Sequence, residues 1–236
     1  MLQVSHVNFS YGRVPALEDV TFDVAPGEIV GLVGPNGSGK TTLIRCMFDL
    51  LRLGSGRITI DGEPHASLTA RQSSVMTASN EQMSEFLTGA EYVRLVASMF
   101  GLRVTADEIA EQFDALCMPG RQDDLIEDYS HGMRKKTQLT AAFLVARPLT
   151  VIDETLNGID LDALLVCEDA LAAARRAERS VVLCSHDLSV LERVADRLIL
   201  LDHGCVALED TVAAVVAEYG SIHQLVRTHL GTNRVG

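Results

Sequence analysis

Apolar residues along the first part of this chain follow two different patterns. Residues 2–9 alternate between apolar and polar positions, and a second alternating run over 20–24 ends at the turn Pro26-Gly27. A period of two is typical of half-buried β-strands. Residues 29–33 are apolar without interruption, which predicts a further strand.

The pattern becomes helical after residue 40. Apolar residues recur every three or four positions and fall on one face of a predicted helix: Leu43, Ile44, Met47, Phe48 and Leu51. Gly54-Ser55-Gly56 interrupts the chain, and residues 57–60 form another short strand that turns at Asp61-Gly62.

Residues 88–118 form a helical block between two strand-rich parts. Its first helix carries an apolar face made of Tyr92, Val93, Val96, Met99 and Phe100. After a break at Gly101, Ile109, Phe113 and Leu116 share a second face, and Pro119-Gly120 ends that helix. We expect a separate lobe here, with methionines filling gaps in its core.

Strand patterns return in the last third of the chain. They cover residues 149–152, 181–184, 198–201 and 205–208, with a helix predicted over 161–178 and two C-terminal helices near 211–219 and 221–230. Alternating strands and helices predict an α/β fold with a mainly parallel sheet, an N-terminal antiparallel β part and an inserted α-helical lobe. We expect one domain over 1–236: core 1–79 and 131–210, helical lobe about 80–130, extension 211–236.

A glycine-rich stretch links the strand at 29–33 to the helix after it. It reads Gly34-Pro35-Asn36-Gly37-Ser38-Gly39-Lys40-Thr41, and a strand before it and a helix behind it are the context of a P-loop. Glycines let backbone N–H groups close around an anion, and the helix N-terminus points at the same place. Lys40 then reaches the β- and γ-phosphates, and Thr41 can bind Mg²⁺. A glycine turn that binds nothing would not need both of these residues, so we predict a nucleoside triphosphate site.

Two acidic residues follow the strand at 149–152 directly. In a parallel sheet, Asp153 and Glu154 reach the carboxyl edge, where the P-loop also lies. Asp153 can hold Mg²⁺, usually through water, and Glu154 can polarise an attacking water. The alternative, a solvated acidic pair that caps a turn, is less favoured once a P-loop is present.

The next strand ends in Ser185-His186-Asp187. Adjacent residues leave a strand in different directions, so we reject a hydrolase triad, which is built from separated positions. His186 can hydrogen-bond a γ-phosphate; a capping or core histidine is the alternative. Tyr11, at the end of a strand before the P-loop, either stacks on a base or is an ordinary half-buried tyrosine.

Composition narrows the possible partners of the chain. Among 236 residues, 32 acidic against 20 basic residues give a formal charge of −12, which argues against broad binding to nucleic acid or anionic lipid. Five cysteines without C-x-x-C spacing suit reduced, mostly buried thiols in a cytosol. No signal peptide is visible, and no charge-free apolar stretch approaches the length of a membrane span.

A further motif, Tyr129-Ser130-His131-Gly132-Met133, precedes a helical stretch and Asp153-Glu154, and it resembles the signature motif of ATP-binding-cassette ATPases. Together with the P-loop and the acidic pair, it gives the order of motifs found in that family. Over residues 2–210 the chain resembles the nucleotide-binding subunit of ATP-binding-cassette (ABC) transporters, nearest to drug, antibiotic and bacteriocin-immunity exporters. The resemblance implies ATP and Mg²⁺ as ligands and residues 157–160 as the D-loop. The residues that it implies for nucleotide binding are Tyr11, Gly34, Pro35, Asn36, Gly37, Ser38, Gly39, Lys40, Thr41, Thr42, Ser130 and Gly132. Those that it implies for metal binding are Thr41 and Asp153, and for catalysis Glu154, His186 and Lys40.

Two positions depart from the family pattern. The family has Gln at the Q-loop, where this chain has Ser79, with Glu81 and Gln82 nearby as substitute ligands. Thr155 replaces the proline that follows the catalytic glutamate, which predicts a less rigid turn.

The resemblance also implies partners. It predicts a separate integral-membrane permease that the helical lobe touches, and a second nucleotide-binding subunit, identical or not, paired head-to-tail. It places the chain in the cytoplasm, peripheral to the inner face of the cell membrane. A soluble ABC ATPase of translation or DNA repair, without transport, would typically carry two cassettes, a long coiled coil or basic arms, none of which is visible here. For a nucleotide-dependent regulator without turnover, Glu154 argues against and the departure at Ser79 argues in favour, so it stays an alternative.

Overall fold

Two β-sheets and three groups of helices make up the computed structural model, which describes residues 1–77 and 83–232. The larger sheet has six strands in the order β10-β9-β3-β8-β7-β6, and all neighbours in it are parallel except β9 and β10. Its strands are β3 (Ile29–Val33), β6 (Ser74–Thr77), β7 (Leu149–Asp153), β8 (Ser180–Cys184), β9 (Arg197–Asp202) and β10 (Cys205–Thr211). The predicted mainly parallel sheet is confirmed.

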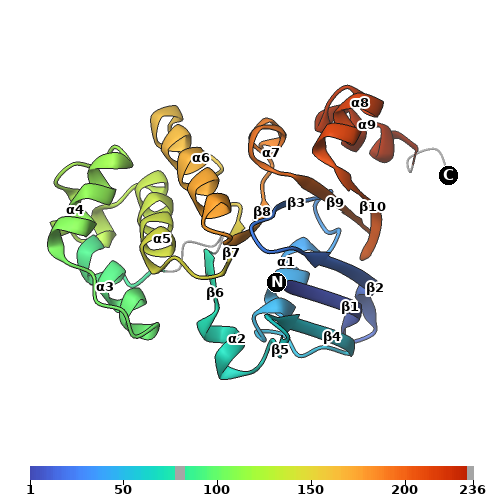
Figure 1. The fold of residues 1–236 in the computed structure, drawn as a ribbon, viewed down its shortest axis with the longest axis horizontal. Helices are drawn as coiled ribbons and strands as arrows, with labels where there is room; N and C mark the ends of the chain where they lie inside the picture. The colour runs from blue at the N-terminus through green and yellow to red at the C-terminus, as the bar shows by residue number, and fades with distance from the viewer. Residues whose placement is uncertain (78–82, 233–236) are drawn as a thin grey trace.

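The smaller sheet is antiparallel and comes mostly from the N-terminal residues. Its order is β2-β1-β4-β5, and its strands are β1 (Leu2–Tyr11), β2 (Val14–Val24), β4 (Ser55–Ile60) and β5 (Glu63–Pro64). Helix α1 (Lys40–Met47) lies between this sheet and the larger one (Figure 1). The helix ends earlier than its apolar spacing predicts, because Phe48 is already its C-cap.

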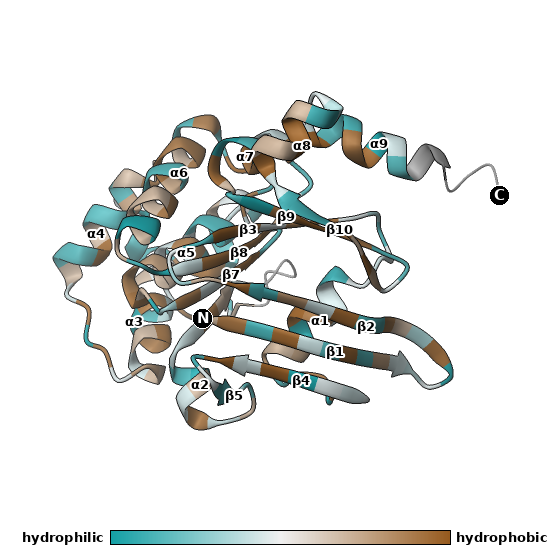
Figure 2. Cartoon of the chain, turned by 45° about the vertical axis from the view of Figure 1, so that its right-hand side comes forward, coloured by the Kyte–Doolittle hydropathy of each residue, from teal (hydrophilic) through white to brown (hydrophobic). Residues whose placement is uncertain are grey.

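Alternate residues of the central strands face two separate cores. Val30 and Leu32 of β3 pack toward α1 and the antiparallel sheet, while Ile29 and Val33 pack on the opposite face. That opposite face is covered by α6 (Leu161–Arg176), α7 (Leu188–Val194), α8 (Val212–Tyr219) and α9 (Ile222–Thr232). Figure 2 shows these hydrophobic strands between the two layers. Burial on both faces explains the uninterrupted apolar run at 29–33.

The helical lobe has a small core of its own. It contains α3 (Gly89–Met99), α4 (Ala106–Ala115) and the 3₁₀ turns η1 (Arg121–Asp123) and η2 (Ile126–Asp128), packed on α5 (His131–Val145). Thr88 with Glu91, and Thr105 with Glu108, form capping boxes that fix where α3 and α4 begin.

Within this lobe, one residue is placed wrongly by the helical pattern. Val93 and Phe113 are fully buried as predicted, but Met99 is 71% exposed. Met99 is the last residue of α3, and the buried residues of this helix are Gly89, Ala90, Val93 and Ala97. It is therefore a surface residue, whereas Met83 and Met118 are buried core residues.

The sequence pattern did not predict several short elements. These are β5, β6, α2 (Leu68–Gln72) and α7. All five cysteines are free, as expected, but Cys117 and Cys205 are exposed and only the other three are buried. Among the described residues, no helix combines the length and the apolar character that crossing a bilayer requires.

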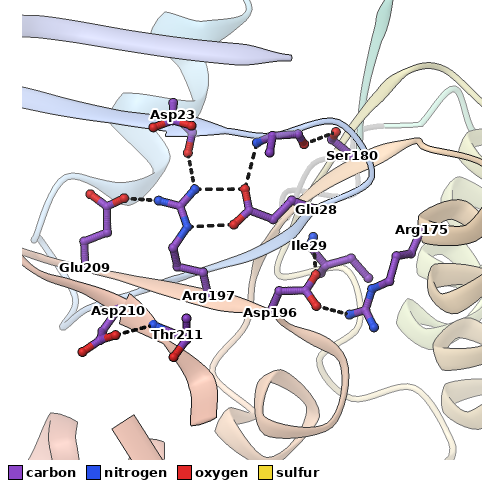
Figure 3. Close-up of polar contacts among 11 residues, drawn as sticks. Asp23, Glu28, Ile29, Arg175, Ser180, Asp196, Arg197, Glu209, Asp210 and Thr211 are labelled. Atoms are coloured by element: carbon purple, nitrogen blue, oxygen red, sulfur yellow. Dashed lines mark hydrogen bonds and ion pairs between the residues drawn. The ribbon is translucent and has the colours of Figure 1, made fainter. Parts of the chain in front are cut away.

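Arg197 fastens the two sheets together. Its guanidinium donates to both carboxylate oxygens of Glu28, at 2.7 and 2.9 Å, and to the main-chain oxygen of Asp23, and it also pairs with Glu209 (Figure 3). Despite the desolvation that opposes it, the Arg197 hydrogen bond holds the pKa of Glu28 below its ordinary value. Next to this network, Asp196 accepts from the Ile29 backbone N–H and pairs with Arg175. These contacts of Arg197 and Asp196 hold the start of β3, and therefore the loop after it, in place.

We expect Arg197→Met to lower the free energy of unfolding by about 3 kcal/mol, because it leaves a partly buried carboxylate without its partner. Urea unfolding measures this. Arg193→Met, which breaks the more exposed pair with Glu168, serves as a control and should cost less than about 1 kcal/mol.

Since the pKa of Glu28 is lowered in the folded state, its contribution to stability is present above the ordinary carboxylate pKa and is lost as the pH falls through the lower folded value. The Arg197→Met effect should shrink over that acid range, and equal effects of both variants at neutral pH would contradict this role.

Candidate functional site

The glycine-rich loop follows β3, the central strand of the parallel sheet, and leads into α1. Gly34 leaves no room for a side chain, since a Cβ there would lie 2.1 Å from the carbonyl oxygen of Leu201. Gly39 is the N-cap of α1 with φ of 106°, and a Cβ would lie 2.6 Å from the oxygen of Ala16. Glycine is therefore required at both positions for the loop to curve into the N-terminus of α1.

Lys40 is the first residue of α1 and is 7% exposed. Its Nζ donates to the carbonyl oxygens of Gly34 and Pro35, at 2.8 and 3.0 Å. The ammonium therefore lies inside the curve of the loop, where backbone N–H groups and the helix N-terminus favour an anion. This arrangement fits a phosphate chain.

The acidic pair lies close to this loop because β8 alone separates β7 from β3. Asp153 ends β7 and is 3% exposed, and its Oδ1 has no hydrogen-bond partner. Burial, and secondly the neighbouring Glu154 carboxylate, raises the pKa of Asp153 above its ordinary value. The nearby Lys40 ammonium opposes that rise.

Glu154 leaves the strand through a left-handed conformation with φ of 58°. Its backbone N–H donates to the oxygen of Cys184, and its Oε1 lies 2.8 Å from His186 Nε2. Glu154 and His186 side chains are 29% and 50% exposed. The arrangement places one carboxylate and one imidazole together at the carboxyl edge of the sheet, and a carboxylate exposed in this way can accept a proton from water.

Ser130 begins helix α5 as its N-cap. Its Oγ accepts from the backbone N–H of Met133 at 3.2 Å, and Ser130 is exposed, with Gly132 following in the first turn of the helix. A serine and a glycine at the exposed N-terminus of a helix can bind an anion.

Comparison with known proteins decides between the possible families of phosphate-binding folds. The family model described as "ABC transporter" matches residues 17–157. The chain belongs to the ABC transporter family. It carries the ATPase domain of that family, whose fold the structure shows.

Individual relatives agree with this family. The chain is 30% identical over 210 residues to a doxorubicin resistance ATP-binding protein of Mycobacterium tuberculosis, a match that covers 86% of this chain and 62% of that protein. A solved ATP-binding subunit of an ABC transporter superposes with a TM-score of 0.86 and 28% identity over 95% of this chain and 97% of the other. A dimeric ATP-binding cassette, solved after hydrolysis with ADP and Pi, has a TM-score of 0.80 at 20% identity, over 89% and 98% of the two chains.

Thr155 stands where the ABC family pattern has a proline. It is fully buried, and its Oγ1 lies 2.8 Å from Thr77 Oγ1 and 3.2 Å from the carbonyl oxygen of Asp153. The hydroxyl therefore makes contacts in this turn that a proline side chain could not make. The contact joins the end of β7 to the end of β6, immediately before the predicted Q-loop.

The predicted D-loop of the ABC family, residues 157–160, is hydrogen-bonded to α5 and to the segment after β8. Ser185 Oγ donates to Asn157 Oδ1 at 2.7 Å, and Lys135 Nζ donates to the Asn157 carbonyl oxygen at 2.7 Å. Asp160 caps α6 and pairs with Lys136, which holds the pKa of Asp160 low despite some desolvation.

Ser185, His186 and Asp187 each have a different partner, so the rejection of a hydrolase triad is confirmed. Ser185 binds Asn157, His186 pairs with Glu154, and the Asp187 carboxylate accepts from Ser189 at the start of α7.

Tyr11 is placed beside the first turn of α1. Its hydroxyl lies 3.4 Å from Thr42 Oγ1, its ring packs edge-on against Phe9, and it is 50% exposed. An exposed aromatic face next to the P-loop suits stacking on a base. The Q-loop candidates Ser79, Glu81 and Gln82 lie outside the described residues.

A pocket of about 430 Å³ opens between the P-loop and the end of β8. It is lined by Gly34, Pro35, Asn36, Ser185, His186, Leu188 and Val226. Val226 belongs to α9, so the C-terminal helix forms part of the rim. This position of α9 could not be predicted, because its residue pattern indicates only an amphipathic helix.

The residues present fit a magnesium ion. Asp153 offers a buried carboxylate oxygen without a partner, and such an oxygen is a ligand that Mg²⁺ prefers. Thr41 follows Lys40 in the first turn of α1 and is partly exposed. Asp153 and Thr41 are the residues that would hold the ion.

Proposed function

We propose that this chain is the ATP-hydrolysing, nucleotide-binding subunit of an ABC exporter that drives a separate membrane permease. The observation that carries the proposal is the Glu154–His186 pair beside a buried Asp153 and a glycine loop that encloses Lys40. A binding protein without turnover needs the loop but not a paired, solvent-accessible carboxylate at the strand end. The resemblance to a drug-resistance protein supports export as the role, although the chain spans only 62% of that protein's length.

The proposed chemistry divides the residues into two groups. The P-loop amides, Lys40 and Tyr11 bind the nucleotide, with Lys40 facing the β- and γ-phosphates. Bound Mg²⁺, held by Thr41 and Asp153, would neutralise phosphate charge. Glu154 accepts a proton from the attacking water while the water oxygen bonds to the γ-phosphorus and the bond to the β-phosphate oxygen breaks. His186, held 2.8 Å from Glu154, orients that carboxylate and can donate to the γ-phosphate.

A second copy or a similar subunit would complete the site. Ser130 and Gly132 form an anion-binding helix start, yet they belong to α5, on a different part of the sequence and fold from the P-loop at α1. In a head-to-tail pair, each α5 N-terminus would face the γ-phosphate bound by the other copy. The dimeric cassette of the same fold supports the pairing of two such chains.

The helical lobe is the proposed contact with the permease. Phe86 is 85% exposed and Leu125 37%, and their chain neighbours Leu87 and Ile126 are joined by a hydrogen bond from the Ile126 N–H to the Leu87 oxygen. Exposed large apolar residues of this kind suit a protein contact. Through that contact the chain would sit on the cytoplasmic face of the membrane.

If two copies share each site, ATPase activity per molecule should rise with protein concentration. Ser130→Arg, which places a cation and a bulky side chain at the α5 N-terminus, should inactivate the opposing site. In a mixture with Glu154→Gln, each hybrid dimer regains one site, made of the intact Glu154 of one chain and the intact Ser130 of the other, so the mixture should be more active than either variant alone. Steady-state phosphate release across a concentration series tests both points. Activity independent of concentration in a verified monomer would count against shared sites.

The permease contact is tested by Phe86→Asp in cells that co-express the chain with its candidate permease. We expect the variant to leave the membrane fraction while its MgATP affinity is unchanged. The exposed Leu68→Asp on α2 is the matched control and should stay membrane-bound. Equal membrane binding of both variants would place the contact elsewhere.

A further inference from the structure

A thiol lies among the acidic groups at the end of β7. Cys184 is the register partner of Asp153 in the parallel pairing of β8 with β7, so both side chains leave the sheet on the same face. Single ligand atoms of Asp153, Glu154 and Cys184 all lie within 4.8 Å of one another. Ligands around a tetrahedral Zn²⁺ lie about 3–4 Å apart, given bonds of about 2.0–2.3 Å. Small side-chain rotations would therefore bring the three atoms into one coordination sphere.

The three groups complement one another as ligands. Asp153 is 3% exposed, and its Oδ1 has no hydrogen-bond partner. Cys184 is 1% exposed and brings a thiol sulfur, whereas Glu154 is 29% exposed and opens the cluster to solvent. Oxygen ligands alone suit Mg²⁺, but a thiolate among them shifts the preference toward softer metals.

We propose that Asp153, Glu154 and Cys184 form a binding site for a thiophilic divalent cation, Zn²⁺ or Cd²⁺. On binding, the Cys184 thiol gives its proton to solvent and its sulfur bonds to the cation. Two carboxylates and a thiolate exceed the charge of the cation by one negative unit, and the Lys40 ammonium nearby offsets it. A water molecule from the open side, at Glu154, fills the fourth position.

Such a cation would inhibit turnover. A Glu154 carboxylate bound to metal cannot accept a proton from water, and Asp153 is no longer available to Mg²⁺. The cation site follows from the side chains themselves, but this inhibitory effect rests on the proposed function. We expect Zn²⁺ to inhibit ATP hydrolysis and Cys184→Ser to relieve the inhibition.

The site is tested on the nucleotide-free, full-length chain by titration with Cd²⁺. The exposed Cys117 and Cys205 are first replaced by serine, which leaves three buried cysteines. The ultraviolet thiolate-to-cadmium absorption should saturate at one Cd²⁺ per chain. Cys184→Ser in this background should lose the band and bind Cd²⁺ at least about 10-fold more weakly. Cys167→Ser, at another buried cysteine, is the matched control and should keep it.

Several outcomes would overturn the site. No band in the background protein, while MgATP still binds, rejects the cation site and leaves the proposed function standing. If the absorption band survives Cys184→Ser, it comes from another cysteine, and the proposed site is rejected. If Cys184→Ser does not fold, Asp153→Asn decides: it should bind Cd²⁺ at least about 10-fold more weakly, and unchanged affinity rejects the proposal. Failure of MgATP binding would count against the proposed function instead.

Discussion

Glu154→Gln should bind MgATP with unchanged affinity and hydrolyse it at least ~100-fold more slowly, since a general base typically contributes that much or more. The amide keeps the size of the side chain and can still bond to His186, but it cannot accept a proton from water. Phosphate release under saturating MgATP measures the turnover, and isothermal titration measures the affinity.

Glu127→Gln, at an exposed glutamate of the helical lobe, is the control for a loss of one negative charge. It should hydrolyse ATP at the wild-type rate. If Glu154→Gln turns over normally, the water is activated by another group, and the role given to the end of β7 is wrong.

The second large effect concerns binding. Lys40→Ala removes the ammonium that lies inside the P-loop, 2.8 Å from the Gly34 oxygen. A charge-assisted hydrogen bond contributes about 1.5–3 kcal/mol, so the affinity for MgATP should fall about 10- to 100-fold. Isothermal titration measures this. Arg94→Ala, at an exposed cation on α3, should bind normally. Equal affinities of Lys40→Ala and wild type would mean that the P-loop is not the nucleotide-binding site.

Much of the site could be predicted because its residues are local in sequence. Gly34 and Gly39 occur in one loop, and backbone crowding by Leu201 and Ala16 leaves glycine as the residue that fits. Asp153 follows its strand directly, so the rule that parallel strands share a carboxyl edge was enough to bring it to the P-loop.

Contacts between distant segments could not be predicted. Thr155 and Thr77 are 78 positions apart and meet only because β6 and β7 are neighbours. Cys184 stands beside Asp153 for the same reason, since β8 lies between β3 and β7, an order that no local pattern contains. Local periodicity also placed Met99 in the core, because it finds the apolar face of a helix but not how much of that face its neighbours cover.

The most direct test of the account is the molecular mass of Glu154→Gln in solution, measured by sedimentation with MgATP and with MgADP. Blocked hydrolysis should trap ATP between the P-loop of one copy and the Ser130 helix start of the other. We expect a dimer with MgATP, a monomer with MgADP, and a monomer with either nucleotide when Ser130→Arg is added. A protein that binds MgATP and stays monomeric, at concentrations where the wild type hydrolyses ATP, would contradict it.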